Sequence, residues 1–169
     1  EKKDGTWKIT RINNYRDFLD FLAPIQTAGM EAYVKATSDI IDKYIDILDT
    51  QQTNFRLMTA TSEGRLASAQ RTKLCAYIRS DIIPALEKRQ QELDQIPVTD
   101  GGQYISNLRK ESTNLSIQSW QHFAAGIEHD NIKDLGTAKA FHKDAMDLER
   151  RIDDLLKNTA VNKIAKIIP

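Results

Sequence analysis

The 169-residue chain contains a single cysteine, Cys75. An internal disulfide is therefore excluded, and so is the Cys-x-x-Cys-His attachment site of a c-type haem. The residues around Cys75, from Leu74 to Ile78, are apolar or aromatic. A free cysteine in such surroundings behaves as a small hydrophobic residue. We expect Cys75 to be an inert part of the core and not a nucleophile.

No charge of either sign is in excess, because 24 Lys and Arg residues face 24 Asp and Glu residues. A nucleic-acid-binding protein usually shows a basic excess or a basic stripe, so we predict no nucleic-acid partner. No run approaches the roughly 18 apolar residues of a membrane span, and no secretory signal is visible. Only 7 Gly and 4 Pro accompany 40% hydrophobic residues, which favours a folded, helix-rich chain over disorder.

Signatures of catalysis and metal binding are also missing. No Glu is followed three residues later by His, which argues against a di-iron bundle, and Gly101-Gly102 is not followed by the Lys-Ser/Thr of a phosphate-binding loop. His122 and His129 lie about 10 Å apart along a helix, too far to share an ion. A site that combines either one with His142 remains an alternative. We predict no catalytic residue, no metal ion and no cofactor.

The chain begins Glu1-Lys2-Lys3-Asp4-Gly5, without Met. A short polar opening of this kind is typical of a protein from which a signal, a lipid-anchored cysteine or a membrane helix has been removed. A tag remnant or an arbitrary domain boundary gives the same pattern. We favour a periplasmic or extracellular location with a membrane tether outside the given sequence, and a cytoplasmic location stays open.

Apolar residues at helical spacing are what the chain does contain. One stripe recurs every three or four residues, and a stripe of this kind must be covered by other helices. Its members are Met30, Val34, Thr37, Ile41, Tyr44, Leu48, Gln51, Phe55 and Met58. Thr37 and Gln51 are the polar members, and in a core they need hydrogen-bond partners or a loosely packed layer.

Turn signals divide the chain into helices of a single domain, 1–169. We predict an all-α fold, an elongated antiparallel up-down-up-down four-helix bundle preceded by a short N-terminal extended segment and helix, with both chain ends at one pole. The expected elements are the extended segment 1–12, a short helix capped by Asn13 or Asn14, and core helices at about 24–58, 63–96, 102–128 and 132–160.

Single residues refine these expected boundaries. Pro24 should mark a kink or the first turn of the first core helix, and Pro84 should kink the second. Thr99 or Asp100 is expected to cap the third core helix, and Asn131 the fourth.

Aromatic residues at helical spacing supply the candidate ligand site. Tyr77, Tyr104, Trp120 and Phe123 could wall a small-ligand cavity between helices, although the same pattern is typical of an ordinary core. Our first hypothesis is a non-catalytic binding or structural domain outside the cytoplasm, lipoprotein-like or envelope-associated, that acts through a protein partner. The alternative is the ligand-sensing ectodomain of a membrane receptor, which binds a small molecule between helices or at a homodimer interface. Only in architecture does the chain resemble such ectodomains and small helical lipoproteins.

Overall fold

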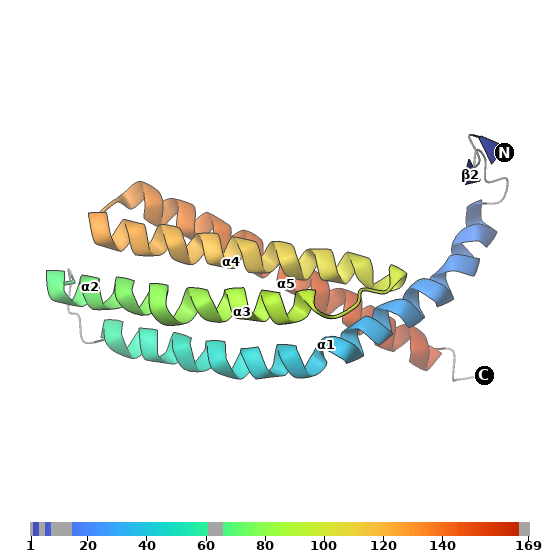
Figure 1. Ribbon diagram of the computed structural model, residues 1–169, viewed down its shortest axis with the longest axis horizontal. Coiled ribbons are helices and arrows are strands. Elements are labelled where there is room, and N and C mark those ends of the chain that lie inside the picture. Colours follow the sequence, from blue (N-terminus) through green and yellow to red (C-terminus); the bar gives the residue numbers. More distant parts are fainter. Residues whose placement is uncertain (1, 4–5, 8–14, 61–65, 166–169) are drawn as a thin grey trace.

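A computed structural model describes the backbone of residues 2–3, 6–7, 15–60 and 66–165, and the side chains of residues 28–59 and 66–157. Helices dominate the described residues (Figure 1). The α-helices are α1 (Tyr15–Ala60), α2 (Ser68–Tyr77), α3 (Ile83–Asp94), α4 (Gln103–His129) and α5 (Ile132–Ala165). A π-helix, η1 (Ile78–Ile82), and a 3₁₀ turn, η2 (Asp100–Gly102), join neighbouring helices. The strands β1 (Lys2–Lys3) and β2 (Thr6–Trp7) form an antiparallel pair.

The helices form an elongated bundle in which successive rods alternate in direction (Figure 1). Helices α2, η1 and α3 follow one another without a gap in the chain, and together they make one rod, called the middle rod below. The predicted all-α, up-down-up-down four-helix bundle is confirmed. Helix α1 begins and α5 ends at the same pole of the molecule, as predicted (Figure 1).

Helix α1 is longer than predicted. It runs without interruption from Tyr15 to Ala60, so the prediction of a separate short helix before a core helix starting at Pro24 is wrong. A proline inside a helix removes one backbone hydrogen bond and bends the helix, but it need not end it. Figure 1 shows that α1 bends where it leaves the bundle. The predicted cap residues, 13 and 14, lie outside the described residues.

The N-terminal extended segment is confirmed in the part that the structure describes. Lys2 pairs with Trp7 and Lys3 pairs with Thr6 in the short antiparallel ladder. Residues 8–12 of the predicted segment lie outside the described residues.

Pro84 disturbs the middle rod, as predicted, but the distortion takes the form of a π turn. Because Pro84 has no N–H, it cannot donate to the carbonyl four residues earlier. The N–H of Ile83 instead donates to the carbonyl of Ile78, five residues back, within the π-helix. The backbone regains α geometry at Ile83, so α2 and α3 remain one rod.

A network of buried and half-buried polar groups joins the four rods, and α5 takes part through Glu149, which accepts from the hydroxyl of Ser112 at 2.6 Å. Thr37 of α1 is fully buried and accepts a hydrogen bond from Nη1 of Arg109 at 2.5 Å. On the same helix α4, Thr113 accepts from Nη2 of Arg89 on α3 at 2.7 Å. Burial lowers the pKa of Arg89, and the charge of Glu149 on α5 opposes that shift. Thr37 therefore has the partner that its place in the core requires.

The second polar member of the stripe, Gln51, is satisfied only in part by the neighbouring rod, because its Oε1 is buried without a hydrogen-bond partner among the described residues. Nε2 of Gln51 donates to the carbonyl of Asp81 at 3.0 Å. Further along the middle rod, the Glu92 carboxylate accepts from Nζ of Lys43 at 2.9 Å and from the hydroxyl of Tyr44 at 2.8 Å. These polar contacts fix the register between α1 and the middle rod.

The turns that lead into α4 and α5 differ in how they are capped. The prediction that Thr99 or Asp100 caps the third core helix is wrong, because neither side chain makes a capping hydrogen bond. The hydroxyl of Thr99 instead donates to the carbonyl of Gly29 on α1 at 2.6 Å. The predicted cap at Asn131 is confirmed, since its Oδ1 accepts from the backbone N–H of Lys133 at 3.0 Å.

Helix α5 packs chiefly along α4, its partner in a helical hairpin. Ala138 and Ala145 are buried at this seam, and each carbonyl accepts a hydrogen bond from a serine of α4. Ser119 reaches Ala138 at 2.9 Å and Ser112 reaches Ala145 at 3.4 Å. Small residues on both sides allow this close approach, as the sequence predicts.

Candidate functional site

A groove opens between α1, α4 and α5, near the turn that joins α4 to α5. It encloses about 420 Å³. Most of its lining is apolar or aromatic, with a few polar side chains among them. The lining residues are Phe55, Ser119, Trp120, Phe123, Leu135, Ala138, Lys139 and His142. We call this feature the α1–α4–α5 groove.

Three aromatic side chains form one wall of the groove. The ring centroids of Phe55 and Trp120 lie 5.3 Å apart, those of Phe55 and Phe123 lie 5.7 Å apart, and those of Trp120 and Phe123 lie 5.9 Å apart. All three pairs are edge-to-face, the arrangement that the charge distribution of aromatic rings favours. We call these residues the aromatic triad. They are only partly buried, so some of their ring surface remains open to the groove.

The tight turn between α4 and α5 sets the opposite wall. Asp130 ends α4 in the left-handed conformation, with φ of 53°. Gly126 is buried against Leu135, and a Cβ at this glycine would lie 2.7 Å from Cδ2 of Leu135 and 3.0 Å from its backbone N. Only glycine permits this approach of the two helices without displacing backbone. The contact holds Leu135 in place as a lining residue of the groove.

Lys139 and His142 are the only ionisable residues that line the groove. Both are exposed and both belong to α5, separated by three residues, which places them on one face of the helix. Within the part of the chain that the structure describes, Lys139 takes part in no ion pair. The groove therefore combines an aromatic interior with a basic rim.

Two of the four predicted site residues meet in this groove. Trp120 and Phe123 lie three residues apart on α4, and both contribute to the aromatic triad. The sequence reasoning missed Phe55, Leu135, Lys139 and His142. Phe55 was recognised only as a member of the α1 stripe, and His142 only as a weak metal ligand. Which faces of α1 and α5 border α4 is decided by packing and not by local spacing.

The other two predicted residues, Tyr77 and Tyr104, do not line this groove, so the structure does not bring all four together. The hydroxyl of Tyr77 donates to the carbonyl of Gln51 at 3.4 Å, in the seam between the middle rod and α1. Tyr104 is 46% exposed near the start of α4, and the guanidinium of Arg151 lies 5.5 Å from its ring centre. Tyr77 lines a separate, open hollow of about 410 Å³ between α1 and the middle rod, and Tyr104 lies towards the opposite pole.

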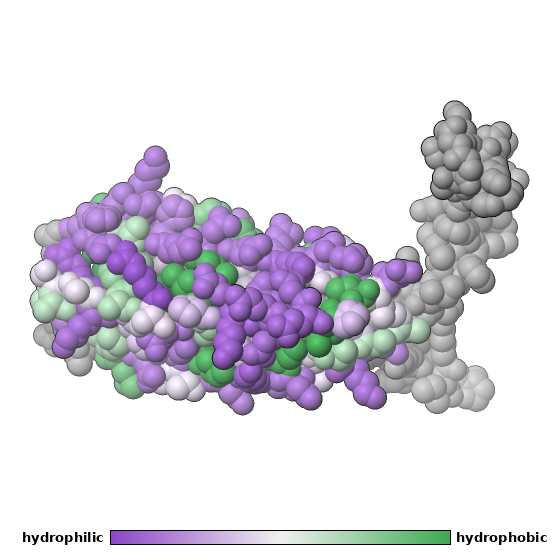
Figure 2. Space-filling view, viewed as in Figure 1, coloured by the Kyte–Doolittle hydropathy of each residue, from purple (hydrophilic) through white to green (hydrophobic). Residues whose placement is uncertain are grey.

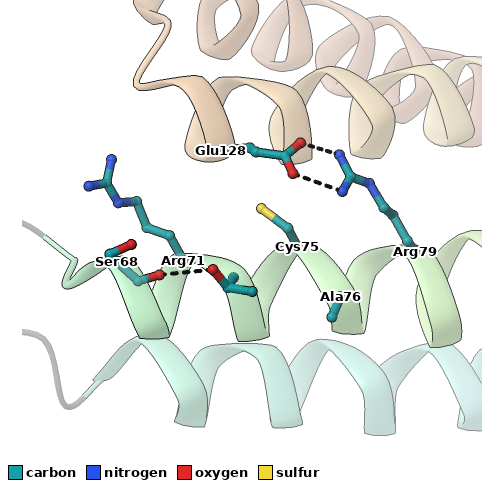
Figure 3. Close-up of a pocket in the computed structure, with 7 residues that line it drawn as sticks. Ser68, Arg71, Cys75, Ala76, Arg79 and Glu128 are labelled. Carbon is teal, nitrogen blue, oxygen red and sulfur yellow. Dashed lines mark hydrogen bonds and ion pairs between the residues drawn. The ribbon is translucent and has the colours of Figure 1, made fainter.

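A smaller pocket of about 240 Å³ surrounds Cys75 (Figure 3). Arg79 of η1 and Glu128 of α4 form an ion pair across it. Cys75 itself is 3% exposed, and its Sγ lies 3.3 Å from the carbonyl of Ala124, to which the thiol donates. Burial raises the pKa of the Cys75 thiol, and the charge of Glu128 adds to the rise. The protonated, enclosed thiol fits the predicted role of Cys75 as an inert core residue.

The histidines occupy separate environments. Nδ1 of His122 lies 3.0 Å from Oδ1 of Asp134, and Nε2 of His129 lies 3.8 Å from Oε2 of Glu128. His142 lines the groove. Among the described residues, no group of three or more His, Cys, Asp and Glu side chains is placed to hold a metal ion.

The face shown in Figure 2 is mostly hydrophilic, with hydrophobic residues in separate patches. Asp39, Asp42, Asp46 and Asp49 of α1 are all exposed. In the part of the chain that the structure describes, no helix is both long enough and apolar enough to cross a bilayer.

Comparisons with protein-family models, with curated proteins and with solved structures find no match for this chain. Its function is therefore inferred from its own residues.

Proposed function

We propose that this protein is a non-catalytic binding domain that holds a small, mainly apolar molecule in the α1–α4–α5 groove. The observation that carries the proposal is the aromatic triad, whose three rings face a groove of about 420 Å³ and remain partly exposed. Ligand pockets are concave, mostly apolar and usually 300–1,000 Å³ in volume. Burying ring surface against an apolar ligand would be favourable by about 25 cal/mol for each Å² removed from water.

The side chains that line the groove support binding better than catalysis. A hydroxyl nucleophile needs a base within hydrogen-bond reach of its oxygen. Ser119 is the one hydroxyl residue of the lining, and its Oγ donates to the carbonyl of Ala138 at 2.9 Å. Its proton is thus engaged by a backbone group that cannot act as a general base.

A location outside the cytoplasm is part of the same proposal. A bundle in which α1 begins and α5 ends at one pole suits a receptor ectodomain or a lipoprotein-like domain that is tethered at that pole. Ligand capture by the groove would then be the sensing step. The encoded sequence on both sides of residues 1–169 tests the location. A membrane helix or a signal segment there supports it, and a cytoplasmic domain fused directly to either end contradicts it.

Binding can be tested with N-phenyl-1-naphthylamine, a neutral aromatic dye whose fluorescence rises in apolar surroundings. We expect saturable enhancement with one dye per chain. The variant Phe55→Ala removes one ring of the aromatic triad and should weaken dye binding at least about tenfold. Absence of saturable binding by the wild-type protein would refute the proposal.

Two further variants make the test specific to the groove. Tyr104→Ala removes an aromatic ring of comparable size from the other end of α4 and should leave dye binding unchanged. His142→Trp places a bulky side chain at the exposed rim and should block the groove without removing core packing. Thermal unfolding of each variant shows that it remains folded. Equal dye binding by His142→Trp and the wild type would place the dye elsewhere.

A second candidate function is a protein interface, here a homodimer, formed over the same face. An exposed hydrophobic residue beside the groove favours it, because Met146 follows His142 by one turn on α5 and is 50% exposed. Sedimentation velocity tests this candidate. A dimer that Met146→Glu dissociates supports it, and a concentration-independent monomer rules it out.

A further inference from the structure

We infer that the molecule bound in the α1–α4–α5 groove is an aromatic or branched aliphatic carboxylate. Its apolar body would lie against the aromatic triad, and its carboxylate would lie beside Lys139 and His142. This inference rests on the proposed function and narrows it to one class of ligand.

The charge of the lining residues selects an anion. Lys139 and His142 both offer N–H donors, and no Asp or Glu lines the groove. The nearby Asp134 of α5 is engaged elsewhere, since its Oδ1 lies 3.0 Å from Nδ1 of His122 and its Oδ2 accepts from Nδ2 of Asn131 at 2.6 Å. A carboxylate would therefore meet donors and a positive charge at the rim, whereas an ammonium group would be repelled by Lys139.

The placement of the two basic residues suits a head group with two oxygens. Lys139 and His142 are three residues apart on α5, so their Cβ atoms are about 5–6 Å apart on one face of the helix. Leu135 precedes Lys139 by one turn and is part of the apolar wall. The basic pair thus lies directly beside the apolar surface. One carboxylate can contact both basic side chains while the attached ring or branched chain remains in the groove.

The size and exposure of the groove limit the ligand further. A volume of about 420 Å³ lies near the lower end of the range for ligand pockets, which favours a body of one ring or a short branched chain. Lys139 and His142 are exposed, so water screens their charge. We therefore expect the carboxylate to improve binding only roughly three- to tenfold over a neutral group of the same size.

Three compounds with the same apolar body test the ligand class. They are 4-phenylbutyrate, 4-phenyl-1-butanol and 4-phenylbutylamine, each used to displace N-phenyl-1-naphthylamine from the wild-type protein. We expect the acid to displace the dye at roughly three- to tenfold lower concentration than the alcohol, and the amine to be the weakest. Added NaCl should weaken the binding of the acid and leave the binding of the alcohol unchanged, because salt screens the charge interaction.

Substitutions at the rim assign the preference to a residue. Lys139→Gln should abolish the difference in affinity between the acid and the alcohol, and Lys139→Arg should keep that difference. Lys143→Gln is the matched control, since it removes an exposed lysine one turn further along α5 that does not line the groove.

The results separate this inference from the proposed function. If the alcohol or the amine displaces the dye as well as the acid does, or if none of the three compounds displaces it, the carboxylate class is wrong. The binding function would still stand on saturable dye binding that His142→Trp abolishes. If the dye itself does not bind, both proposals fail. If Lys143→Gln loses the preference for the acid as fully as Lys139→Gln does, the carboxylate preference does not come from Lys139 and the inference is overturned.

Discussion

Replacing Thr37 with Val tests whether the buried polar network holds the rods together. Val has nearly the same shape as Thr but lacks the hydroxyl that accepts from Nη1 of Arg109 at 2.5 Å. Thr37 is fully buried and Arg109 is 8% exposed, so water cannot readily replace the lost acceptor. The substitution leaves a charged donor without a partner in the core, on the seam between α1 and α4.

The expected cost follows from the charge of that donor. Hydrogen bonds to charged groups contribute about 1.5–3 kcal/mol, and a stranded buried donor loses at least that much. Thr37→Val should therefore lower the free energy of unfolding by about 1.5–3 kcal/mol, equivalent to roughly 3–12 °C in Tm for a domain of this size. In an Arg109→Met background the same substitution should cost less than about 0.5 kcal/mol, because no charged donor remains to be stranded.

Urea denaturation followed by circular dichroism at 222 nm measures these free energies. Thr37 also donates its hydroxyl to the carbonyl of Tyr33, four residues earlier, at 2.9 Å. Thr50→Val is the matched control, because Thr50 makes the same kind of bond to the carbonyl of Asp46 but is exposed and has no arginine partner. Its stability should stay within about 0.5 kcal/mol of the wild type. The reasoning would be refuted if Thr37→Val lost no more free energy of unfolding than Thr50→Val. It would also be refuted if Thr37→Val lost as much in the Arg109→Met background as in the wild type.

Two further predictions concern titratable groups outside the groove. Cys75 is 3% exposed, and burial raises the pKa of its thiol. Ellman's reagent at neutral pH should therefore label Cys75 at least about tenfold more slowly in the native protein than in guanidinium. Equal labelling rates would contradict the burial of Cys75. The hydrogen bonds from Lys43 and Tyr44 lower the pKa of Glu92, so its contribution to stability is present above its ordinary pKa of about 4.3 and is lost as the pH falls through the lower native value. Glu92→Gln should accordingly be less stable than the wild type at pH 7, and this difference in stability should shrink as the pH is lowered. Urea denaturation at several pH values measures it. A difference that does not change with pH would contradict the lowered pKa of Glu92.

The helices could be predicted from the sequence because their signals are local. The turn at 97–102 and the cap at Asn131 separate the last helices, and their predicted bounds lie close to those of α4 and α5. The effect of a proline was harder to predict. Pro24 lies within one continuous helix, whereas Pro84 follows a π turn in which the N–H of Ile83 donates to the carbonyl of Ile78.

The candidate site could be predicted only in part. Trp120 and Phe123 are neighbours on one helix, so their spacing alone brings them together. Phe55 comes from α1, and no local pattern shows that its ring contacts theirs. Tyr77 and Tyr104 have the same aromatic character and similar helical spacing, yet packing places them in other seams.

By itself, the sequence determined that this chain forms long amphipathic helices that must cover one another, because the spacing of apolar residues along a helix fixes which side chains share a face. The tertiary structure alone decided that α5 follows α4 closely through Ala138, Ala145 and Gly126, and that the seam towards α1 is left as a groove. The physical reason is that a groove is formed between faces of different helices, and the rotation and spacing of those helices depend on contacts between residues distant in sequence.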